Sequence, residues 1–356
     1  MNEADRFLKK QVEEEKTPSV HYIHFNHESL IHRFNTGWAD IRNQHQINEH
    51  CTYNAYSVTK TFTALAVLQL AEKGKLEIDD PVNVYLSTFP YGTDISIRQL
   101  LTHSAGIPNP IPLSWIHLVS EHAAFDRNHF FDQVFKKNPR TSFMPNEKFQ
   151  YSNLGYVLLG QLIEKCSGIS YEQYILEQIL IPLGITPGEL GFMIQTNAMH
   201  ARGYHKRYSL SNAVLSFLIN KKKFMGKAEG AWSPFNDFYI NGVSYGGLIG
   251  TANSFVKYIQ ELLRPDCKIL SDSYKKMLFL ENHTNAGKET GMCLSWFSGK
   301  LNGNTYFAHA GGGGGYYCEL RIYPNLNRGS VVMFNRSGMT DERFLDKVDR
   351  FFVAEQ

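Results

Sequence analysis

Strand-like segments lie at the two ends of this 356-residue chain, and mainly helical segments lie between them. Near the N-terminus, residues 21–25 and 29–34 flank the turn-prone sequence NHE, which predicts an antiparallel hairpin. Near the C-terminus, the strand-like runs CELRIYP and GSVVMFN flank NLNR. A sheet built from both ends, flanked by helices from the middle, is the simplest arrangement that buries all these apolar faces. The sequence therefore predicts a mixed α/β (α+β) fold with an antiparallel sheet.

Helices are predicted by apolar periodicity and by their end signals. We expect them at residues 3–15, in FTALAVLQLAEKG up to Gly74, in NLGYVLLGQLIEKCSG up to Gly168, and in the closing sequence DERFLDKVDRFF. The region from about 75 to 240 is expected to be an all-helical insertion between the sheet-forming ends. Within it, residues 187–245 show no clear period, which fits either a cover over a site or a structural excursion.

Charge and composition exclude several classes of function. The formal charge of +2, from 36 basic and 34 acidic side chains, lacks the concentrated positive field that nucleic acid requires. No apolar run reaches the length of a membrane span, and the first 16 residues lack the apolar core of a secretory signal. The five cysteines are scattered without a C-x-x-C pair, so neither a disulfide framework nor a zinc site is indicated. We expect a reduced, cytoplasmic protein without metal, cofactor, nucleic-acid or membrane partner.

Ser57 and Lys60 stand three positions apart in YNAYSVTKTFTALAVLQLAEKGK, at the start of an otherwise apolar helix. Residues at this spacing share one helix face. A serine hydroxyl needs a neighbouring base to become a nucleophile, and a desolvated lysine can have its pKa lowered enough to serve. The helix N-terminus adds free N–H groups where an oxyanion would form. The same S-x-x-K spacing recurs at residues 254–257 and 273–276, so spacing alone does not identify a site.

Two further elements follow in the chain: YSN at residues 151–153 and HAG at residues 309–311, with LLTHSAGIP before the first of them. In this order and at these separations, the chain resembles the serine β-lactamase and penicillin-binding-protein family. The resemblance is strongest to its class C-like branch, with family VIII esterases, D-aminopeptidases and D-Ala-D-Ala carboxypeptidases. It spans roughly residues 19–353 and includes FQYSNLGYVLLGQLIEKCSG, GGLIGTANSFVKYIQ and HAGGGGGYYCELRIYP. It implies a β-lactamase/transpeptidase-like fold, as a single serine hydrolase domain over residues 1–356.

The resemblance also implies catalytic roles for four residues of the first two elements. Ser57 would be the acylated nucleophile and Lys60 its proton-transfer partner. Tyr151 would act as a second general base, in acylation and for the deacylating water. Asn153 would bind the substrate's acyl-side amide or carbonyl and steady Lys60. Which of Lys60 and Tyr151 is the dominant base stays open at this point.

The third element, where many relatives have K-T-G, is H-A-G here. By the same resemblance, His309 and Gly311 would lie against the substrate. The backbone N–H groups of Ser57 and Gly312 would form the oxyanion hole.

The first two elements also have ordinary structural interpretations. Ser57 could be a helix N-cap with Lys60 reaching to water. Tyr151 could be a core aromatic residue, with Asn153 as the N-cap of the following helix. The Y-x-N pattern recurs at residues 239–241 and 323–325, so only its place in the series supports the first copy.

The two histidines of the motif segments have different interpretations. His309 could simply end a strand before a glycine run, although it belongs to the only H-x-G triplet in the chain. His103, in LLTHSAG, is more simply a buried residue that ties a turn to the backbone, and we leave it out of the predicted site.

The histidine of the third element bears on the substrate. A lysine there would present a fixed charge to a substrate carboxylate, whereas a histidine with its ordinary pKa near 6.5 is mostly neutral at pH 7. The prediction is therefore an esterase or amidase that acts on small acyl substrates. The substrate is expected to be an ester, amide or lactam, and the sequence does not indicate the oligomeric state. Alternatives are a D-amino-acid peptidase or carboxypeptidase, a weak β-lactamase, or a catalytically silent binding or assembly protein on the same fold. A metal-dependent hydrolase is disfavoured, because the 14 histidines show no H-E-x-x-H spacing.

Overall fold

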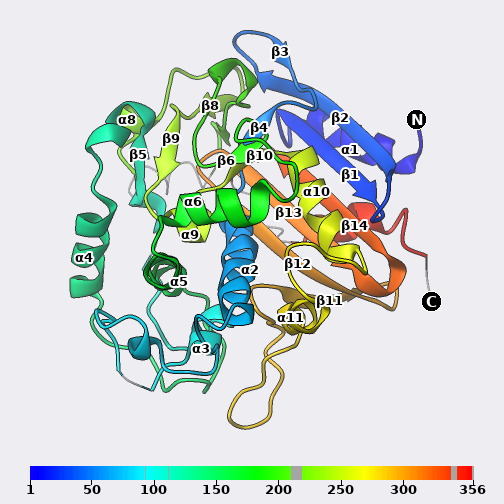
Figure 1. Ribbon diagram of the computed structural model, residues 1–356. Coiled ribbons are helices and arrows are strands. Elements are labelled where there is room, and N and C mark those ends of the chain that lie inside the picture. The colour runs from blue at the N-terminus through cyan, green and yellow to red at the C-terminus, as the bar shows by residue number, and fades with distance from the viewer. Residues whose placement is uncertain (93, 111, 210–218, 338–342, 355–356) are drawn as a thin grey trace.

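The computed structural model describes residues 1–354 except 93, 111, 210–218 and 338–342, and the structural statements below concern these residues (Figure 1). Its main element is a seven-stranded antiparallel sheet in the order β11-β12-β13-β14-β1-β2-β3. The strands are β1 (Ser19–Phe25), β2 (Leu30–Asp40), β3 (His45–Gln46), β11 (Phe297–Leu301), β12 (Asn304–Gly313), β13 (Tyr316–Tyr323) and β14 (Arg328–Phe334). The two ends of the chain meet where β1 pairs with β14. The expected sheet from both termini and the expected N-terminal hairpin are confirmed.

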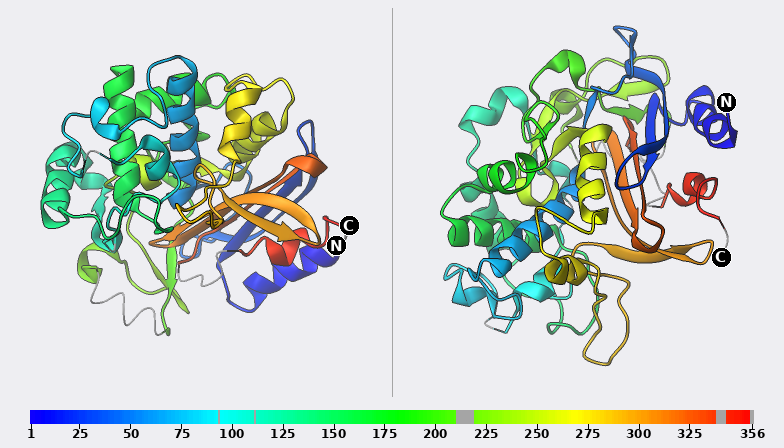
Figure 2. Two further views of the ribbon diagram at one scale, coloured as in Figure 1. Left: turned by 90° about the horizontal axis from the view of Figure 1, so that it is seen from below. Right: turned by 45° about the vertical axis from the view of Figure 1, so that its right-hand side comes forward.

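Helices cover both faces of this sheet (Figure 2). On one face, α10 (Ala252–Leu263) packs against β14 and β1 as part of the large helical layer. On the opposite face lie α1 (Glu3–Glu13) and α12 (Asp346–Asp349), whose apolar side chains form a smaller core with β1 and β13. Successive residues of β1 contribute to different cores, as Tyr22 faces α1 and Ile23 faces the helical layer. This alternation is the ordinary pleat of a strand that is buried on both faces.

The helix α2 (Thr59–Glu72) runs through the centre of the helical layer, and every residue from 59 to 71 is buried. Its sequence is apolar on all sides, which is typical of a helix with no solvent-facing surface. It packs against α5 (Asn153–Ser167) and α9 (Val243–Gly246). The predicted helix ends are confirmed, since Gly74 and Gly168 both adopt positive φ angles, of 64° and 79°, just beyond the last helical residues.

The remaining helical elements are short, and they lie mainly in the middle of the chain. They are η1 (Tyr56–Val58), η2 (Val82–Val84), α3 (Ile97–Leu101), η3 (Pro112–Ser114), η4 (Val119–Ala124), α4 (Arg127–Lys137), α6 (Tyr171–Ile175), η5 (Leu176–Leu180), η6 (Asn197–Met199), α8 (Lys221–Phe224), α11 (Asp272–Leu278) and η7 (Pro324–Leu326).

The prediction that residues 75–240 form an all-helical insertion is wrong in detail. Five short strands lie in this region: β5 (Ile116–Leu118), β6 (Leu190–Gly191), β7 (Tyr204–Lys206), β8 (Trp232–Pro234) and β9 (Phe238–Ile240). They pair as β5-β9, as β7-β8, and as β4-β10-β6 with β4 (Thr52–Asn54) and β10 (Ile249–Thr251). Strands of two or three residues are too short to show a period of two in the sequence.

Two other predicted elements differ from the structure at their ends. The first helix stops at Glu13, two residues early, because Glu15 adopts a left-handed φ of 50°. The expected closing helix is present only as α12, and residues 341 and 342 of that prediction lie outside the described residues.

Candidate active site

Ser57 lies in the 3-10 turn η1, directly before α2. Its neighbour Tyr56 adopts a left-handed φ of 49°, a strained conformation for a bulky side chain. The glycine run of β12 approaches this turn closely. A Cβ atom on Gly311 would lie 2.6 Å from the backbone nitrogen of Ser57 and 2.2 Å from the carbonyl oxygen of Ala55. Only glycine therefore permits this approach of the strand to Ser57.

Lys60 follows one helical turn later and its side chain is fully buried. Its Nζ lies 3.0 Å from Ser57 Oγ, 2.8 Å from Asn153 Oδ1 and 2.8 Å from the carbonyl oxygen of Tyr245. The rings of Tyr151 and Tyr245 flank the amine, with centroids 4.9 and 5.2 Å from Nζ. The S-x-x-K pair expected to meet on one helix face does so.

Burial lowers the pKa of Lys60 well below its ordinary value of 10.5. A neutral lysine amine has two N–H donors and one lone pair. The carbonyl oxygens of Asn153 and Tyr245 can only accept, so together they engage both donors. The lone pair is then left for the Ser57 hydroxyl, which can donate its proton to it. This is the geometry of a general base beside a nucleophile.

Asn153 is the first residue of α5, whose N-cap is Ser152. Its amide nitrogen Nδ2 donates to Asn109 Oδ1 over 3.1 Å, and its backbone N–H donates to the same oxygen over 3.0 Å. Asn109 thereby orients the Asn153 side chain so that Oδ1 faces Lys60. The alternative role of Asn153 as N-cap is wrong, since Ser152 occupies that position.

Tyr151 and His309 face each other across the site. The Tyr151 hydroxyl lies 3.4 Å from His309 Nε2, and His309 Nδ1 contacts the carbonyl oxygen of Ser295. Since a carbonyl can only accept, Nδ1 carries the proton and Nε2 presents a lone pair to Tyr151. His309 is thus a hydrogen-bond acceptor for the tyrosine hydroxyl.

His309 is buried, with 1% of its surface exposed, and burial together with the nearby Lys60 lowers its pKa to about 3. The sequence-based assumption of an ordinary pKa near 6.5 is therefore wrong. His309 stays neutral in mildly acidic solution as well as at pH 7.

A cavity of about 670 Å³ opens beside Ser57 and extends along β12. Its wall includes Ser57, Tyr151, Asn153 and residues 310–313, so residues of all three sequence elements meet there. Gly311 lies in the wall as predicted, whereas His309 does not line the cavity, because its buried ring faces Tyr151 and Ser295. Aromatic side chains form much of the remaining wall: Phe149, Phe297, Tyr306, Tyr316 and Tyr317. Arg343 also lines the cavity. The cavity wall therefore includes a cation, although the third element has a histidine where many relatives have a lysine.

The competing S-x-x-K copies lie elsewhere and have ordinary partners. Ser254 is buried in α10 and donates to the carbonyl oxygen of Thr251 over 2.7 Å. Lys257 forms a salt bridge with Glu189 over 2.7 Å. Ser273 lies on the exposed side of α11. Neither serine lies in the wall of the cavity beside Ser57.

The tyrosines of the other Y-x-N copies do not line the cavity. Tyr239 lies in β9 and its hydroxyl accepts from the backbone N–H of Ile194 over 3.2 Å. Tyr323 is buried on the outer face of the sheet, where its hydroxyl donates to Asp349 over 2.9 Å.

His103 has the structural role expected for it. It is buried, adopts a left-handed φ of 55°, and accepts at Nδ1 from the backbone N–H of Ser152 over 3.1 Å. Its ring also lies 4.2 Å from the Tyr151 ring, so the turn supports the tyrosine.

The sequence did not single out Asn109, Tyr245 or Arg343. Tyr245 acts through its backbone carbonyl, which any residue could provide. Tyr245 belongs to the aperiodic segment 187–245, which also contacts the cavity wall where His200 Nε2 lies 2.9 Å from the Tyr316 hydroxyl. Residues 210–218 of that segment lie outside the described residues.

The described residues contain neither a metal site nor a membrane-spanning helix. No group of three or more His, Cys, Asp or Glu side chains there is arranged to hold a metal ion. In the same part of the chain, no helix combines the length and hydropathy needed to cross a bilayer.

Comparison with known proteins connects this geometry to one family. The family model described as Beta-lactamase matches residues 4–355. Among curated proteins, the chain is 25% identical to penicillin-binding protein 4* of Bacillus subtilis over 317 residues, which cover 88% of this chain and 67% of that protein. It is 23% identical to protein flp of Staphylococcus aureus over 346 residues, covering 94% of this chain and 62% of flp. The chain therefore spans about two thirds of the length of these relatives.

Solved structures show the same fold. An octameric penicillin-binding protein homologue from Pyrococcus abyssi superposes with a TM-score of 0.75 at 24% identity, covering 99% of this chain and 77% of that one. D-amino acid amidase from Ochrobactrum anthropi has a TM-score of 0.75 at 18% identity, covering 97% and 95%. A class C β-lactamase has a TM-score of 0.73 at 18% identity, covering 99% and 96%.

Proposed function

The chain belongs to the β-lactamase family, whose model it matches over residues 4–355, and on this basis we propose that it is a serine hydrolase with Ser57 as its nucleophile. The observation that carries the proposal is the partly buried contact of Lys60 Nζ with Ser57 Oγ at 3.0 Å, beside a cavity that Ser57 helps to line. Burial lowers the pKa of this amine, and no ion pair joins it to a carboxylate among the described residues, which favours the neutral form that can accept a proton.

In the proposed acylation step, Lys60 takes the proton of the Ser57 hydroxyl as Oγ attacks the substrate carbonyl. The Oγ–carbon bond forms and the bond from that carbon to the leaving group breaks, which gives an acyl-enzyme. Asn153 and the Tyr245 carbonyl hold the amine in place throughout. We therefore assign Lys60 as the dominant base for acylation.

The backbone N–H groups of Ser57 and Gly312 are proposed to bind the developing oxyanion, since both residues line the cavity and β12 packs against η1. Tyr151 is proposed to pass a proton to the leaving group and later to accept one from the deacylating water. Its hydroxyl faces the His309 Nε2 lone pair, which can hold the tyrosine proton in place before the reaction.

The proposed substrates are esters or amides with small acyl groups. Neutral His309 brings no charge to the third element, where a lysine would bring one, and Phe149, Phe297 and Tyr306 in the cavity wall favour apolar substrate groups. A second candidate, hydrolysis of an amide that bears a carboxylate, is favoured by Arg343 in the cavity wall.

The rival hypothesis is a binding or assembly protein that retains the fold without catalysis. An intact-mass screen separates the two. The protein is incubated with a fluorophosphonate, p-nitrophenyl esters, D-amino-acid amides and β-lactams, and any adduct is mapped to a peptide. We expect one adduct, on Ser57, and none in Ser57→Ala. Fold retention in that variant is checked by circular dichroism, and we expect it because Ser57 makes no helix-capping hydrogen bond.

Absence of any adduct in the wild type, together with absence of ester hydrolysis, would support the silent protein instead. An adduct on Ser254 or Ser273 would show that another S-x-x-K copy is the nucleophile.

A further inference from the structure

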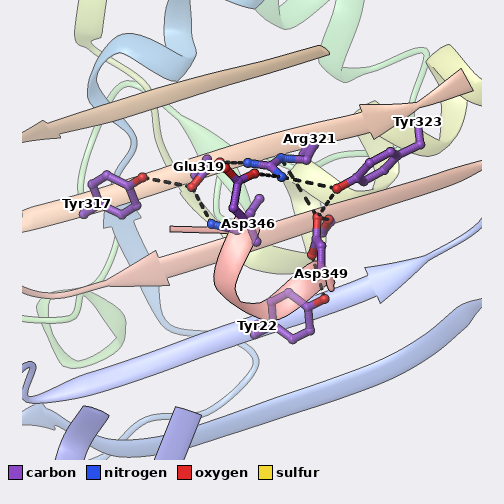
Figure 3. Close-up of polar contacts among 9 residues, drawn as sticks. Tyr22, Tyr317, Glu319, Arg321, Tyr323, Asp346 and Asp349 are labelled. Atoms are coloured by element: carbon purple, nitrogen blue, oxygen red, sulfur yellow. Dashed lines mark hydrogen bonds and ion pairs between the residues drawn. The ribbon is translucent and has the colours of Figure 1, made fainter. Parts of the chain in front are cut away.

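A buried cluster of charged and hydroxyl groups lies on the face of the sheet that α12 covers (Figure 3). Its centre is Arg321, which is fully buried and faces three carboxylates, those of Glu319, Asp346 and Asp349, at 2.8, 2.5 and 4.0 Å. Tyrosine hydroxyls from two strands complete the Arg321 cluster: Tyr22, Tyr317 and Tyr323.

The Glu319 carboxylate makes three contacts within this cluster. Oε1 accepts from Arg321 Nη2 over 2.8 Å. Oε2 accepts from the Tyr317 hydroxyl over 2.9 Å and from the backbone N–H of Leu345 over 3.0 Å. The carboxylate thus joins β13 to the segment that leads into α12.

Two of these contacts lead directly to the cavity. The Tyr317 side chain lines the cavity, and so does Arg343, which precedes Leu345 by two residues. Tyr317 pairs with Gly312 in the β12-β13 register, and Glu319 pairs with Ala310. Since paired residues project from the same face of a sheet, Glu319 lies next to the Ala310 side of the cavity wall.

We propose that Glu319 is a positioning residue for the active-site cavity, which holds the Tyr317 ring and the backbone that carries Arg343 in their places. The inference rests on the proposed hydrolase function. It assigns Glu319 to substrate binding, through the shape of the cavity, and gives it no part in the chemistry at Ser57.

The charge of the cluster makes this position sensitive to pH. One guanidinium faces three carboxylates, and burial raises the pKa of Glu319 to about 7 against the opposing effect of Arg321. The ionisable groups around it are Arg321, Tyr317 and Tyr323 from β13, Tyr306 from β12, Tyr22 from β1, and Asp346 and Asp349 from α12. A protonated Glu319 carries an O–H that points toward groups which themselves donate to it, so at least one of the three contacts weakens. The hydrogen bond of Glu319 with Tyr317 or with Leu345 should therefore weaken as the pH falls through about 7.

The test compares two variants with a matched control, on the wild-type chain, with p-nitrophenyl acetate and p-nitrophenyl butyrate as substrates. Tyr317→Phe removes the hydroxyl that donates to Glu319, and Glu319→Gln removes the ionisable group. The control Tyr22→Phe removes an equivalent hydroxyl from the same cluster. This hydroxyl donates to Asp349 over 2.9 Å, and Tyr22 does not line the cavity.

We expect KM to rise roughly threefold to tenfold in Tyr317→Phe and Glu319→Gln, with kcat within about twofold of the wild type. The rise is moderate because only part of the free energy of the lost hydrogen bond affects substrate binding. The double variant should show no larger change than either single one, because the two groups act as a unit. KM of the wild type should rise as the pH falls from 8 to 6, and this rise should be absent in Glu319→Gln. Tyr22→Phe should leave KM unchanged.

An unchanged KM in Tyr317→Phe, or an equal rise in Tyr22→Phe, would overturn the inference even if Glu319→Gln fails to fold. A wild type that shows neither ester turnover nor a Ser57 adduct would overturn the proposed function, and the inference with it. A wild type that is labelled at Ser57 but insensitive to the Tyr317 change would overturn the inference alone.

Discussion

Replacing Lys60 by methionine tests the proposed base most directly, because methionine keeps much of the side-chain volume and removes the amine. In the structure, Lys60 Nζ is the group in contact with Ser57 Oγ, at 3.0 Å. Without it, the hydroxyl must lose its proton to a weaker or more distant acceptor. Loss of a general base commonly costs about 10² to 10⁴ in rate, or roughly 3 to 5 kcal/mol of barrier.

The same change should affect stability much less. The oxygens of Asn153 and Tyr245 each lose a donor that lies 2.8 Å away, at a net cost of about 1 kcal/mol for each hydrogen bond. A loss of about 2 kcal/mol leaves a protein of ordinary stability folded. A fall in rate of 10² or more in Lys60→Met therefore reports on chemistry rather than on unfolding.

The assay is the single-turnover rate of Ser57 labelling by a fluorophosphonate, measured by intact mass over a range of pH. In the wild type this rate should rise with pH as Lys60 loses its proton. The plateau should be reached well below pH 10.5, because burial lowers the pKa of Lys60. Lys60→Met should lack this rise.

Lys257→Met is the matched control, since Lys257 occupies the same position in a competing S-x-x-K copy and pairs with Glu189 at 2.7 Å. It should label at the wild-type rate. Labelling of Lys60→Met within about tenfold of the wild type would refute the assignment of Lys60 as the base.

Three further predictions concern other parts of the molecule. Tyr151→Phe should slow single-turnover acylation by about 10² or more, and acylation at the wild-type rate would remove the tyrosine from proton transfer. Gly311→Ala should greatly reduce labelling, because the new Cβ would lie 2.6 Å from the Ser57 nitrogen, whereas Gly92→Ala, with no atom within 4 Å, should not. His21 is buried and its pKa is lowered to about 4, so neutral His21 stabilises the fold above its unfolded pKa of about 6.5. About 3 kcal/mol of stability should be lost as the pH falls from about 6.5 to 4, and urea unfolding of His21→Leu should show a pH dependence that is weaker by this amount.

Much of the fold could be predicted from the sequence because its elements are long enough to show their period. The hairpin of β1 and β2, the strands β13 and β14, and the helices α2 and α5 are each marked by apolar patterning and turn or cap residues. The short strands in the middle of the chain could not be predicted in this way. Their pairing joins segments far apart in sequence, as in β5 with β9, so tertiary contacts rather than local patterns determine them.

The placement of the site residues could be predicted where the signal was a side chain in a recognisable order, as for Ser57, Lys60 and Tyr151. It could not be predicted where the contribution was a backbone group or an ordinary surface residue. Tyr245 supplies a carbonyl oxygen, and Asn109 lies in a loop with no distinctive spacing. The neutrality of His309 follows from burial and from its contact with Ser295, which no local pattern shows.

A comparison of Lys60 with Lys257, the lysines of two S-x-x-K copies, shows why the spacing alone carries so little information. Lys257 lies at the surface beside a carboxylate, so its charge is solvated and paired. Lys60 extends from a helix that is buried on all sides, and its polar partners are a hydroxyl, an amide oxygen and a backbone carbonyl. None of these partners carries a charge that would compensate an ammonium group, so burial favours the neutral amine. The apolar sequence of α2, which makes a lysine there look misplaced, is therefore what lowers the pKa of Lys60 and fits it to take a proton from Ser57.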